Sequence, residues 1–140
     1  MTAIESVGRR SLWGLSHLEG TSFGPPSVLD LHGGVVNGYT DCWTHAWRYA
    51  REHGNEYWEG ICEVNGQWQV HAWCVRDGEV IEVTNGYELA TAYKGFKLSD
   101  TARMITSKWE NDPHRSGILE AFLSVTDWPT TRRLVIDTTW

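Results

Sequence analysis

The stretch EGICEVNGQWQVHAWCVRDGEVIEVTN, residues 59–85, decides the fold into which the rest of the chain must fit. Apolar and polar residues alternate along much of it, which is typical of β-strands with one buried face. The dipeptides Asn65-Gly66 and Asp77-Gly78 interrupt the alternation, and both are strong signals for two-residue hairpin turns. The pattern predicts three consecutive antiparallel strands, over residues 59–64, 67–76 and 79–85.

A helix precedes these strands. Between residues 42 and 53 one set of side chains recurs at steps of three and four, as on one face of an α-helix: Cys42, Ala46, Tyr49, Ala50 and His53. Asp41 fits the N-cap position and Gly54 fits the position that ends a helix. We therefore expect an α+β fold in which the helix that begins at Cys42 packs on an antiparallel sheet.

The remaining segments give weaker signals. Residues 1–36 contain many glycines and prolines and indicate an irregular segment with a short helix near residues 9–17. Helices are expected over residues 98–109 and 115–124, and the ending TRRLVIDTTW, residues 131–140, fits a last strand. No repeat or linker divides the chain, so we expect one domain over residues 1–140.

Composition limits the partners that the chain can have. A formal net charge of -6 over 140 residues leaves no overall basic field to attract phosphate groups, and only a local basic patch stays open. No segment has the roughly eighteen consecutive apolar residues of a membrane span, or the apolar core of a signal peptide. Three cysteines, an odd number, favour reduced thiols. We expect a cytoplasmic protein that binds neither nucleic acid nor membrane and needs no metal or organic cofactor.

The second hairpin brings two titratable residues together. If Asp77-Gly78 forms a two-residue turn, Trp73 lies opposite Glu82, and His71 becomes a diagonal neighbour of Glu82 on the same face. Diagonal neighbours are about 7 to 8 Å apart, so a carboxylate can accept a hydrogen bond from the imidazole. A helix packed on that face would bring the Cys42 sulfur to the other imidazole nitrogen. The expected result is a Cys-His-Glu triad.

Cys42 is suited to be the nucleophile of such a triad. The positive end of a helix dipole and its N–H groups favour the thiolate over the thiol, as does an imidazolium partner. The same N–H groups can stabilise the oxyanion that forms when a thiolate adds to a carbonyl. Asn37 or Tyr39, just upstream in the sequence, is the expected second oxyanion donor.

Three short motifs resemble those of the transglutaminase-like branch of the papain-like cysteine enzymes. That family opens a helix with Cys-Trp, carries His-x-Trp on a strand, and has an acidic residue followed by threonine on the next strand. This chain has Cys42-Trp43-Thr44-His45-Ala46, then His71-Ala72-Trp73, then Glu82-Val83-Thr84. The resemblance covers roughly residues 37–86.

The resemblance implies a papain-like fold and acyl transfer through a thioester. Cys42 would attack the carbonyl of a peptide bond or a glutamine side chain, His71 would be the base, and Glu82 would orient it. Small bacterial members of this kind include leader peptidases of lasso-peptide pathways, so a peptide or protein substrate is expected. Two residues depart from the family pattern: Glu82 replaces the usual aspartate, and Asp41 stands where an amide often precedes the cysteine.

Simpler interpretations apply to other residues. Cys62 and Cys74 fall inside strands without a charged partner, and we expect them to be core residues. A zinc site made from Cys42, His45, His71 and Cys74 is the competing interpretation of the motifs. A strand spacing of three places His71 and Cys74 on opposite faces, so we expect no metal.

The nine tryptophans are too many for a chain of this size to bury completely. Most are expected in the core, while Trp43 and Trp73 are candidates for lining an acyl-binding groove beside the triad. The alternative to an enzyme is a binding protein on the same fold, which would hold a protein partner on a tryptophan-rich face without turnover.

Overall fold

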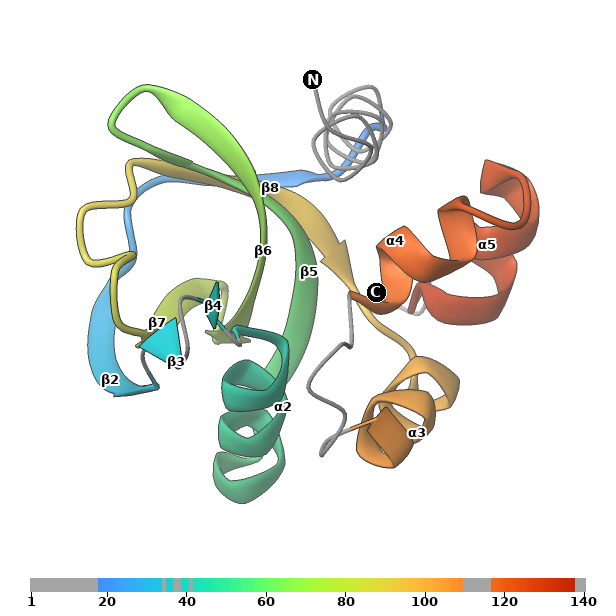
Figure 1. The fold of residues 1–140 in the computed structure, drawn as a ribbon, viewed down its shortest axis with the longest axis horizontal. Coiled ribbons are helices and arrows are strands. Elements are labelled where there is room, and N and C mark those ends of the chain that lie inside the picture. The colour runs from blue at the N-terminus through green and yellow to red at the C-terminus, as the bar shows by residue number, and fades with distance from the viewer. Residues whose placement is uncertain (1–17, 34, 37–38, 41, 110–116, 138–140) are drawn as a thin grey trace.

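The predicted ribbon of three strands forms the centre of the molecule. In a computed structural model that describes residues 18–33, 35–36, 39–40, 42–109 and 117–137, the strands are β5 (Glu56–Val64), β6 (Gln67–Arg76) and β7 (Glu79–Thr84) (Figure 1). Asn65 and Asp77 each have a φ of 53°, and the glycine after each also has a positive φ. Two successive residues with positive φ are what a type I′ hairpin turn requires, so both predicted turns are confirmed.

Three more strands extend the ribbon to a six-stranded sheet in the order β1-β8-β5-β6-β7-β2. β8 (Ala92–Lys97) pairs antiparallel with β5, and β1 (Thr21–Phe23) pairs antiparallel with β8. At the opposite edge, β2 (Val28–Gly33) runs parallel to β7. The sheet is therefore mixed, which corrects our prediction of an antiparallel sheet. Parallel strands need a long crossover connection. The chain between β2 and β7, which includes α2, β5 and β6, is long enough to provide it.

The sequence did not predict the outer strands. Residues 1–36 were expected to be irregular, yet residues 21–23 and 28–33 pair with the sheet, and a two-stranded piece follows in β3 (Val35–Val36) and β4 (Tyr39–Thr40). β1 is short and largely exposed, so it shows no apolar alternation. β8 contains Gly95, which strand propensity disfavours.

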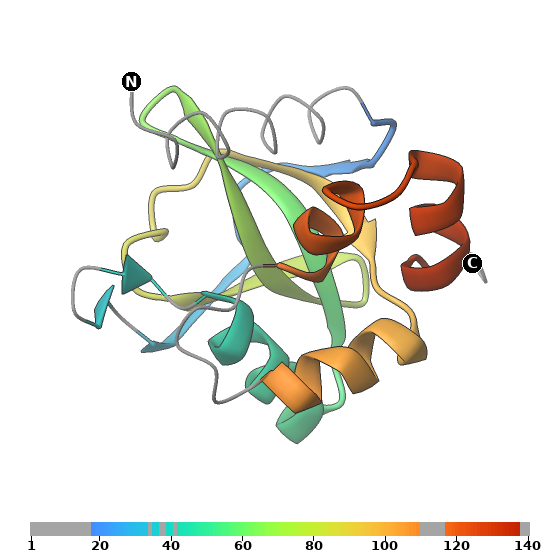
Figure 2. The same ribbon diagram turned by 45° about the vertical axis from the view of Figure 1, so that its right-hand side comes forward.

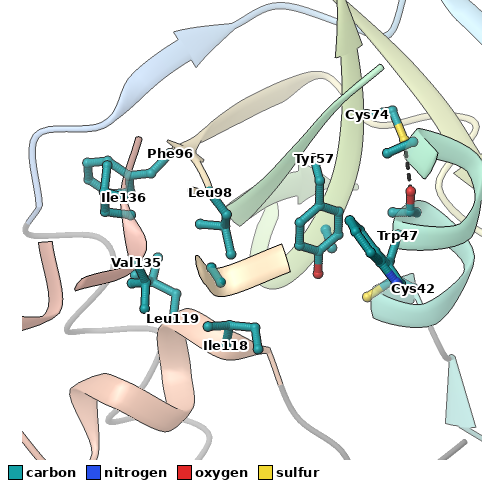
Figure 3. Packing of buried hydrophobic residues seen from close by; sticks show 14 of the residues in the cluster. Cys42, Trp47, Tyr57, Cys74, Phe96, Leu98, Ile118, Leu119, Val135 and Ile136 are labelled. Carbon is teal, nitrogen blue, oxygen red and sulfur yellow. Dashed lines mark hydrogen bonds between the residues drawn. The ribbon is translucent and has the colours of Figure 1, made fainter. Parts of the chain in front are cut away.

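The predicted helix over residues 42–53 is confirmed as α2 (Cys42–His53). Gly54 follows it with a φ of 68°, the left-handed conformation that ends many helices. The helix packs on β6 and β7, and its buried residues are Cys42, Thr44, Ala46, Trp47 and Ala50. The Cys74 thiol donates a hydrogen bond of 3.1 Å to the Ala46 carbonyl, which joins the helix to the sheet (Figure 3).

The C-terminal part of the described chain is helical. The helices are α3 (Asp100–Trp109), α4 (Ile118–Leu123) and α5 (Trp128–Val135); α3 contacts α2, and α4 contacts α5 (Figure 2). The first two agree with the predicted helices. The predicted strand over residues 131–140 is wrong in its described part, residues 131–137, because Asp127 caps α5 by accepting a hydrogen bond of 2.8 Å from the Thr130 N–H. Within residues 131–137 only the bridge from Ile136 to Leu98 has strand character, and residues 138–140 lie outside the described residues.

The sheet has a core on each face. Ala72 and Cys74 point toward the helices, in a cluster that also contains Cys42, Trp47, Tyr57 and residues of α3, α4 and α5 (Figure 3). Trp73 and Val75 point the other way, into a second cluster with Trp58, Cys62, Tyr87 and Tyr93. We call these the helix-side core and the aromatic core.

Gly60 permits the close approach of β5 and β8. A Cβ at Gly60 would lie 2.2 Å from the Lys94 carbonyl oxygen and 2.5 Å from the Gly95 Cα, both backbone atoms. We expect Gly60→Ala to lower the free energy of unfolding by about 2 to 4 kcal/mol, measured by urea denaturation. Gly24→Ala is the matched control, since its Cβ would meet nothing within 4 Å and should change stability by less than about 0.5 kcal/mol. Equal effects of the two substitutions would contradict this account.

Candidate functional site

His71 and Glu82 form a fully buried pair in the aromatic core. The His71 Nε2 atom lies 2.8 Å from the Glu82 Oε1 atom, and neither side chain has solvent exposure. The hydrogen bond follows from the hairpin register, in which Cys74 pairs with Ile81. His71 and Glu82 are each an odd number of residues from this pair, so both point to the other face of the sheet. The sequence therefore predicted this contact correctly.

Hydrogen bonds hold the Glu82 carboxylate on both oxygens. The Tyr93 hydroxyl donates to Oε1 at 2.7 Å, and the Val83 and Thr84 N–H groups donate to Oε2 at 3.1 Å each. With His71, this gives four donors around one acid group, which satisfies an ionised carboxylate without water. A carboxylate so fixed can hold an imidazole in one orientation and one tautomer.

Aromatic rings enclose the His71 imidazole. The Tyr87 ring stacks on it with 3.8 Å between ring centroids and 17° between planes, and Trp73 lies 6.2 Å away at 23°. The second ring nitrogen, Nδ1, is buried and has no hydrogen-bond partner among the described residues. One nitrogen is thus bonded to the Glu82 carboxylate and the other has no partner there, the arrangement that a base held by an orienting acid would need.

Cys42 does not lie on the same face as this pair. The side chain is buried at the first position of α2 and belongs to the helix-side core with Trp47 and Tyr57 (Figure 3). We expected a helix packed on the His71 face, but α2 packs on the opposite one. The alternation along β6 explains this, because Cys74 contacts the helix and residues an odd number of positions away point to the other face.

Tyr87, the ring that covers His71, has a strongly raised pKa. Burial raises the pKa of Tyr87 well above its ordinary range, and the Cys42 and Cys62 sulfurs in their ionised form and the Glu82 carboxylate raise this pKa further. The Tyr87 hydroxyl therefore stays protonated at neutral pH.

The other two thiols are core residues, as predicted. Cys62 is fully buried in the aromatic core, and burial first and Glu82 second raise its pKa well above the ordinary range of a thiol. Such a thiol stays protonated at neutral pH and is a poor nucleophile. Cys74 is fully buried and donates its hydrogen bond to Ala46.

Of the remaining predicted site residues, Trp73 lies beside His71. Trp73 adjoins both His71 and Tyr93 in the aromatic core. Trp43 is half-buried and packs against Gly117, where a Cβ would lie 2.9 Å from its ring. Of the expected oxyanion donors, Tyr39 lies in β4, and Asn37 lies outside the described residues.

Neither a metal centre nor a membrane span is found in the described part of the chain. No three His, Cys, Asp or Glu side chains there are grouped as a metal site. His71 and Cys74, the pair that suggested zinc, lie in different cores. None of the helices within the described ranges has the length and apolar character needed to cross a bilayer.

Sequence reasoning did not find Tyr87, Tyr93 or Glu59. The two tyrosines follow the predicted hairpins in a region for which we predicted no strand, so no register placed them near His71. Glu59 is buried on the helix side of the sheet, where it accepts hydrogen bonds from the Tyr57 hydroxyl at 2.5 Å and from the Ile118 and Leu119 N–H groups at 3.1 and 2.8 Å. Its position within a predicted strand gave no sign of this role.

Comparison with known proteins returned no relative of the chain: no protein-family model, no curated protein and no solved structure matches it.

Glu82→Gln should destabilise the protein strongly. The substitution removes a negative charge and turns an NH₂ group toward donors that include His71 and Tyr93. We expect the free energy of unfolding to fall by about 3 to 5 kcal/mol, as when one partner of a buried pair is removed, measured by urea denaturation. Glu79→Gln, at an exposed site on the same strand, is the control and should change stability by less than about 0.5 kcal/mol. A Glu82→Gln protein as stable as the control would show that the four hydrogen bonds contribute little.

Three buried or partly buried tyrosines should make stability fall at alkaline pH. Burial and the hydrogen bond to Asp30 raise the pKa of Tyr49 from 10.0 to about 12, and burial and Glu82 raise the pKa of Tyr93 much further, as with Tyr87. Each contribution is complete below pH 10, the unfolded-state value, and is lost above it because only the unfolded chain releases the proton. The free energy of unfolding should then fall by about 1.4 kcal/mol per pH unit and per tyrosine. Absorbance at 295 nm should show Tyr87 and Tyr93 ionising only with unfolding; their ionisation in the folded protein near pH 10 would contradict the assignment.

Proposed function

We propose that the protein is a cysteine hydrolase or acyltransferase that acts on an amide bond, with Cys42 as the nucleophile, His71 as the base and Glu82 as the orienting acid. The observation that carries the proposal is the buried His71 imidazole, which is fixed by Glu82 at Nε2 and has a hydrogen-bonding nitrogen left over at Nδ1. The sequence motifs of the chain resemble those of transglutaminase-like enzymes. We therefore also propose that its α+β fold is related to the papain-like fold.

The chemistry follows from the roles of the two imidazole nitrogens. Nδ1 of His71 takes the proton of the Cys42 thiol, and the thiolate adds to the carbonyl carbon of the amide. The resulting oxyanion collapses to a thioester as His71 returns the proton to the leaving amine. Water, deprotonated by His71, then attacks the thioester and releases the acid and the Cys42 thiol. An amine in place of water gives transamidation.

Cys42 is preferred over the other thiols for two reasons. It begins α2, where backbone N–H groups and the helix dipole favour the thiolate. Cys62 shares the face of His71, but its raised pKa keeps it protonated, and Cys74 is fixed to Ala46. The motifs are common to hydrolysis, deamidation and transamidation. The proposal therefore includes both a peptide bond and a glutamine side chain as substrates.

A second candidate is a binding protein that has kept the fold without turnover. The packing of α2 on the face opposite His71 favours it, as does the complete burial of His71 and Glu82. Only part of the predicted tryptophan-rich face is exposed, so that a partner could bind it. Trp47, Trp58 and Trp73 are buried, whereas Trp68 is 38% exposed on the first hairpin.

Alkylation by iodoacetamide distinguishes the two candidates. If the protein is an enzyme, peptide mass spectrometry should show Cys42 alkylated at pH 7 at least about tenfold faster than Cys62 or Cys74 in the folded protein. Cys42→Ala should abolish the fast phase, and Cys62→Ala, the matched control, should leave it unchanged. His71→Ala should move the midpoint of the rate against pH upward, toward that of an ordinary thiol. Three uniformly slow thiols would reject the enzyme in favour of the binding protein.

A further inference from the structure

The His71 pocket is closed, although the proposed reaction needs it to be open. His71 has no solvent exposure, and its Nδ1 atom has no partner among the described residues. A substrate carbonyl and the Cys42 sulfur must both come near this nitrogen during acyl transfer. At least one wall of the pocket must therefore move.

Two of the aromatic walls belong to the sheet. Trp73 lies in β6, and Tyr93 lies in β8, where its hydroxyl is bound to Glu82 at 2.7 Å. The Trp73 ring also packs tightly against Gly95, since a Cβ there would lie 2.7 Å from the ring. Moving the Tyr93 ring would break its hydrogen bond to Glu82, and moving the Trp73 ring would disrupt its close packing against Gly95.

Tyr87 is held differently. It lies in the segment 85–91 between β7 and β8, outside any regular element, and is 9% exposed. Its hydroxyl donates one long hydrogen bond, 3.3 Å, to the amide oxygen of Gln69, which is itself exposed. Stacking on His71 is its closest ring contact, at 3.8 Å.

The segment that carries Tyr87 is attached at its ends. At the far end, the Thr91 N–H donates to the Glu63 carbonyl at 2.9 Å, and the Thr91 hydroxyl donates to the Glu63 side chain at 2.8 Å. At the near end, Gly86 has a φ of 101°, a conformation that side chains rarely adopt. Between these points Leu89 is 73% exposed and so contributes little to the core. Ala90 is buried in the aromatic core, and its N–H donates to the Tyr87 carbonyl at 3.1 Å, so the backbone of the segment is held while the Tyr87 ring is not.

We propose that Tyr87 is a movable cover on His71, and that its displacement opens the enclosed imidazole to solvent and substrate. The proposal rests on the proposed function, because it explains how the enclosed base can act. Removing the ring uncovers the face of His71 on which it stacks. Tyr87 acts through His71 and is a positioning residue rather than a catalytic one.

Modification of histidine by diethyl pyrocarbonate tests the cover directly. The rate at His71, followed by peptide mass spectrometry, is compared with the rate at His53, an exposed residue in the same molecule. We expect Tyr87→Ala to raise the ratio of the His71 rate to the His53 rate at least about tenfold. Tyr87→Phe keeps the ring and loses one hydrogen bond, so it should raise the ratio less than about fivefold. Leu89→Ala, in the same segment, is the matched control and should leave the ratio unchanged.

The wild-type protein provides a test that does not depend on a variant folding. Movement of one ring exposes little surface, so the logarithm of the His71 rate should depend on urea with less than about a quarter of the slope for global unfolding. A full slope would mean that His71 becomes accessible only when the protein unfolds, and this would overturn the proposal. So would an unchanged His71 rate in a folded Tyr87→Ala protein.

Alkylation of Cys42 in the same samples separates this inference from the proposed function. If His71 becomes reactive in Tyr87→Ala while Cys42 remains slow in every protein, the cover exists but the enzyme proposal fails. If Cys42 alkylates fast in the wild type while His71 stays protected in Tyr87→Ala, the enzyme proposal stands and the cover is rejected. Support for both requires a reactive Cys42 and a His71 that Tyr87 protects.

Discussion

The pleat of β6 constrains everything that this molecule can do. Successive side chains of a strand point to opposite faces. Because seven residues separate His71 from the start of β7, the hairpin register fixes the face of the sheet on which each side chain lies. Cys74 contacts α2, and Trp73 enters the aromatic core. The same alternation that aligns His71 with Glu82 also separates both from the face on which the helix lies. The residues of the predicted triad are thus divided by the sheet.

The two buried carboxylates of the sheet show how a charge can serve different purposes. Glu59 accepts hydrogen bonds from Tyr57 and from backbone N–H groups at the start of α4, so it fastens a helix to the sheet. Glu82 instead binds an imidazole and a phenol within a layer of aromatic rings. Replacing a buried ion pair by apolar residues of similar size is often neutral or stabilising by about 1 to 4 kcal/mol. Stability alone therefore gives little reason for Glu82 and His71, and this favours a chemical role for the pair.

The parts of the fold that could be predicted from the sequence are those fixed by local rules. Asn65-Gly66 and Asp77-Gly78 set two turns, and the turns set the register that brings His71 to Glu82. The edge strands and β8 could not be predicted, since their residues are exposed or interrupted by glycine and are held by pairing with distant strands. The face chosen by α2 depends on tertiary packing, which no local pattern encodes. The position of Tyr87 could not be predicted for the same reason, because tertiary packing sets the position of the segment that carries it.

The closed pocket is compatible with catalysis because the cover is weakly held. A stacked ring pair contributes about 0.5 to 1.5 kcal/mol beyond the area it buries, and one long neutral hydrogen bond about 1 kcal/mol or less. If the closed form is favoured by about 2 kcal/mol, roughly 3% of molecules are open at any time, and a substrate that binds only the open form loses about 30-fold in apparent affinity. Contacts between the substrate and the vacated face of His71 can offset that loss. An imidazole held in this way stays shielded from water until a ligand that fits the aromatic core displaces Tyr87, so the burial of His71 is compatible with its proposed role as the base.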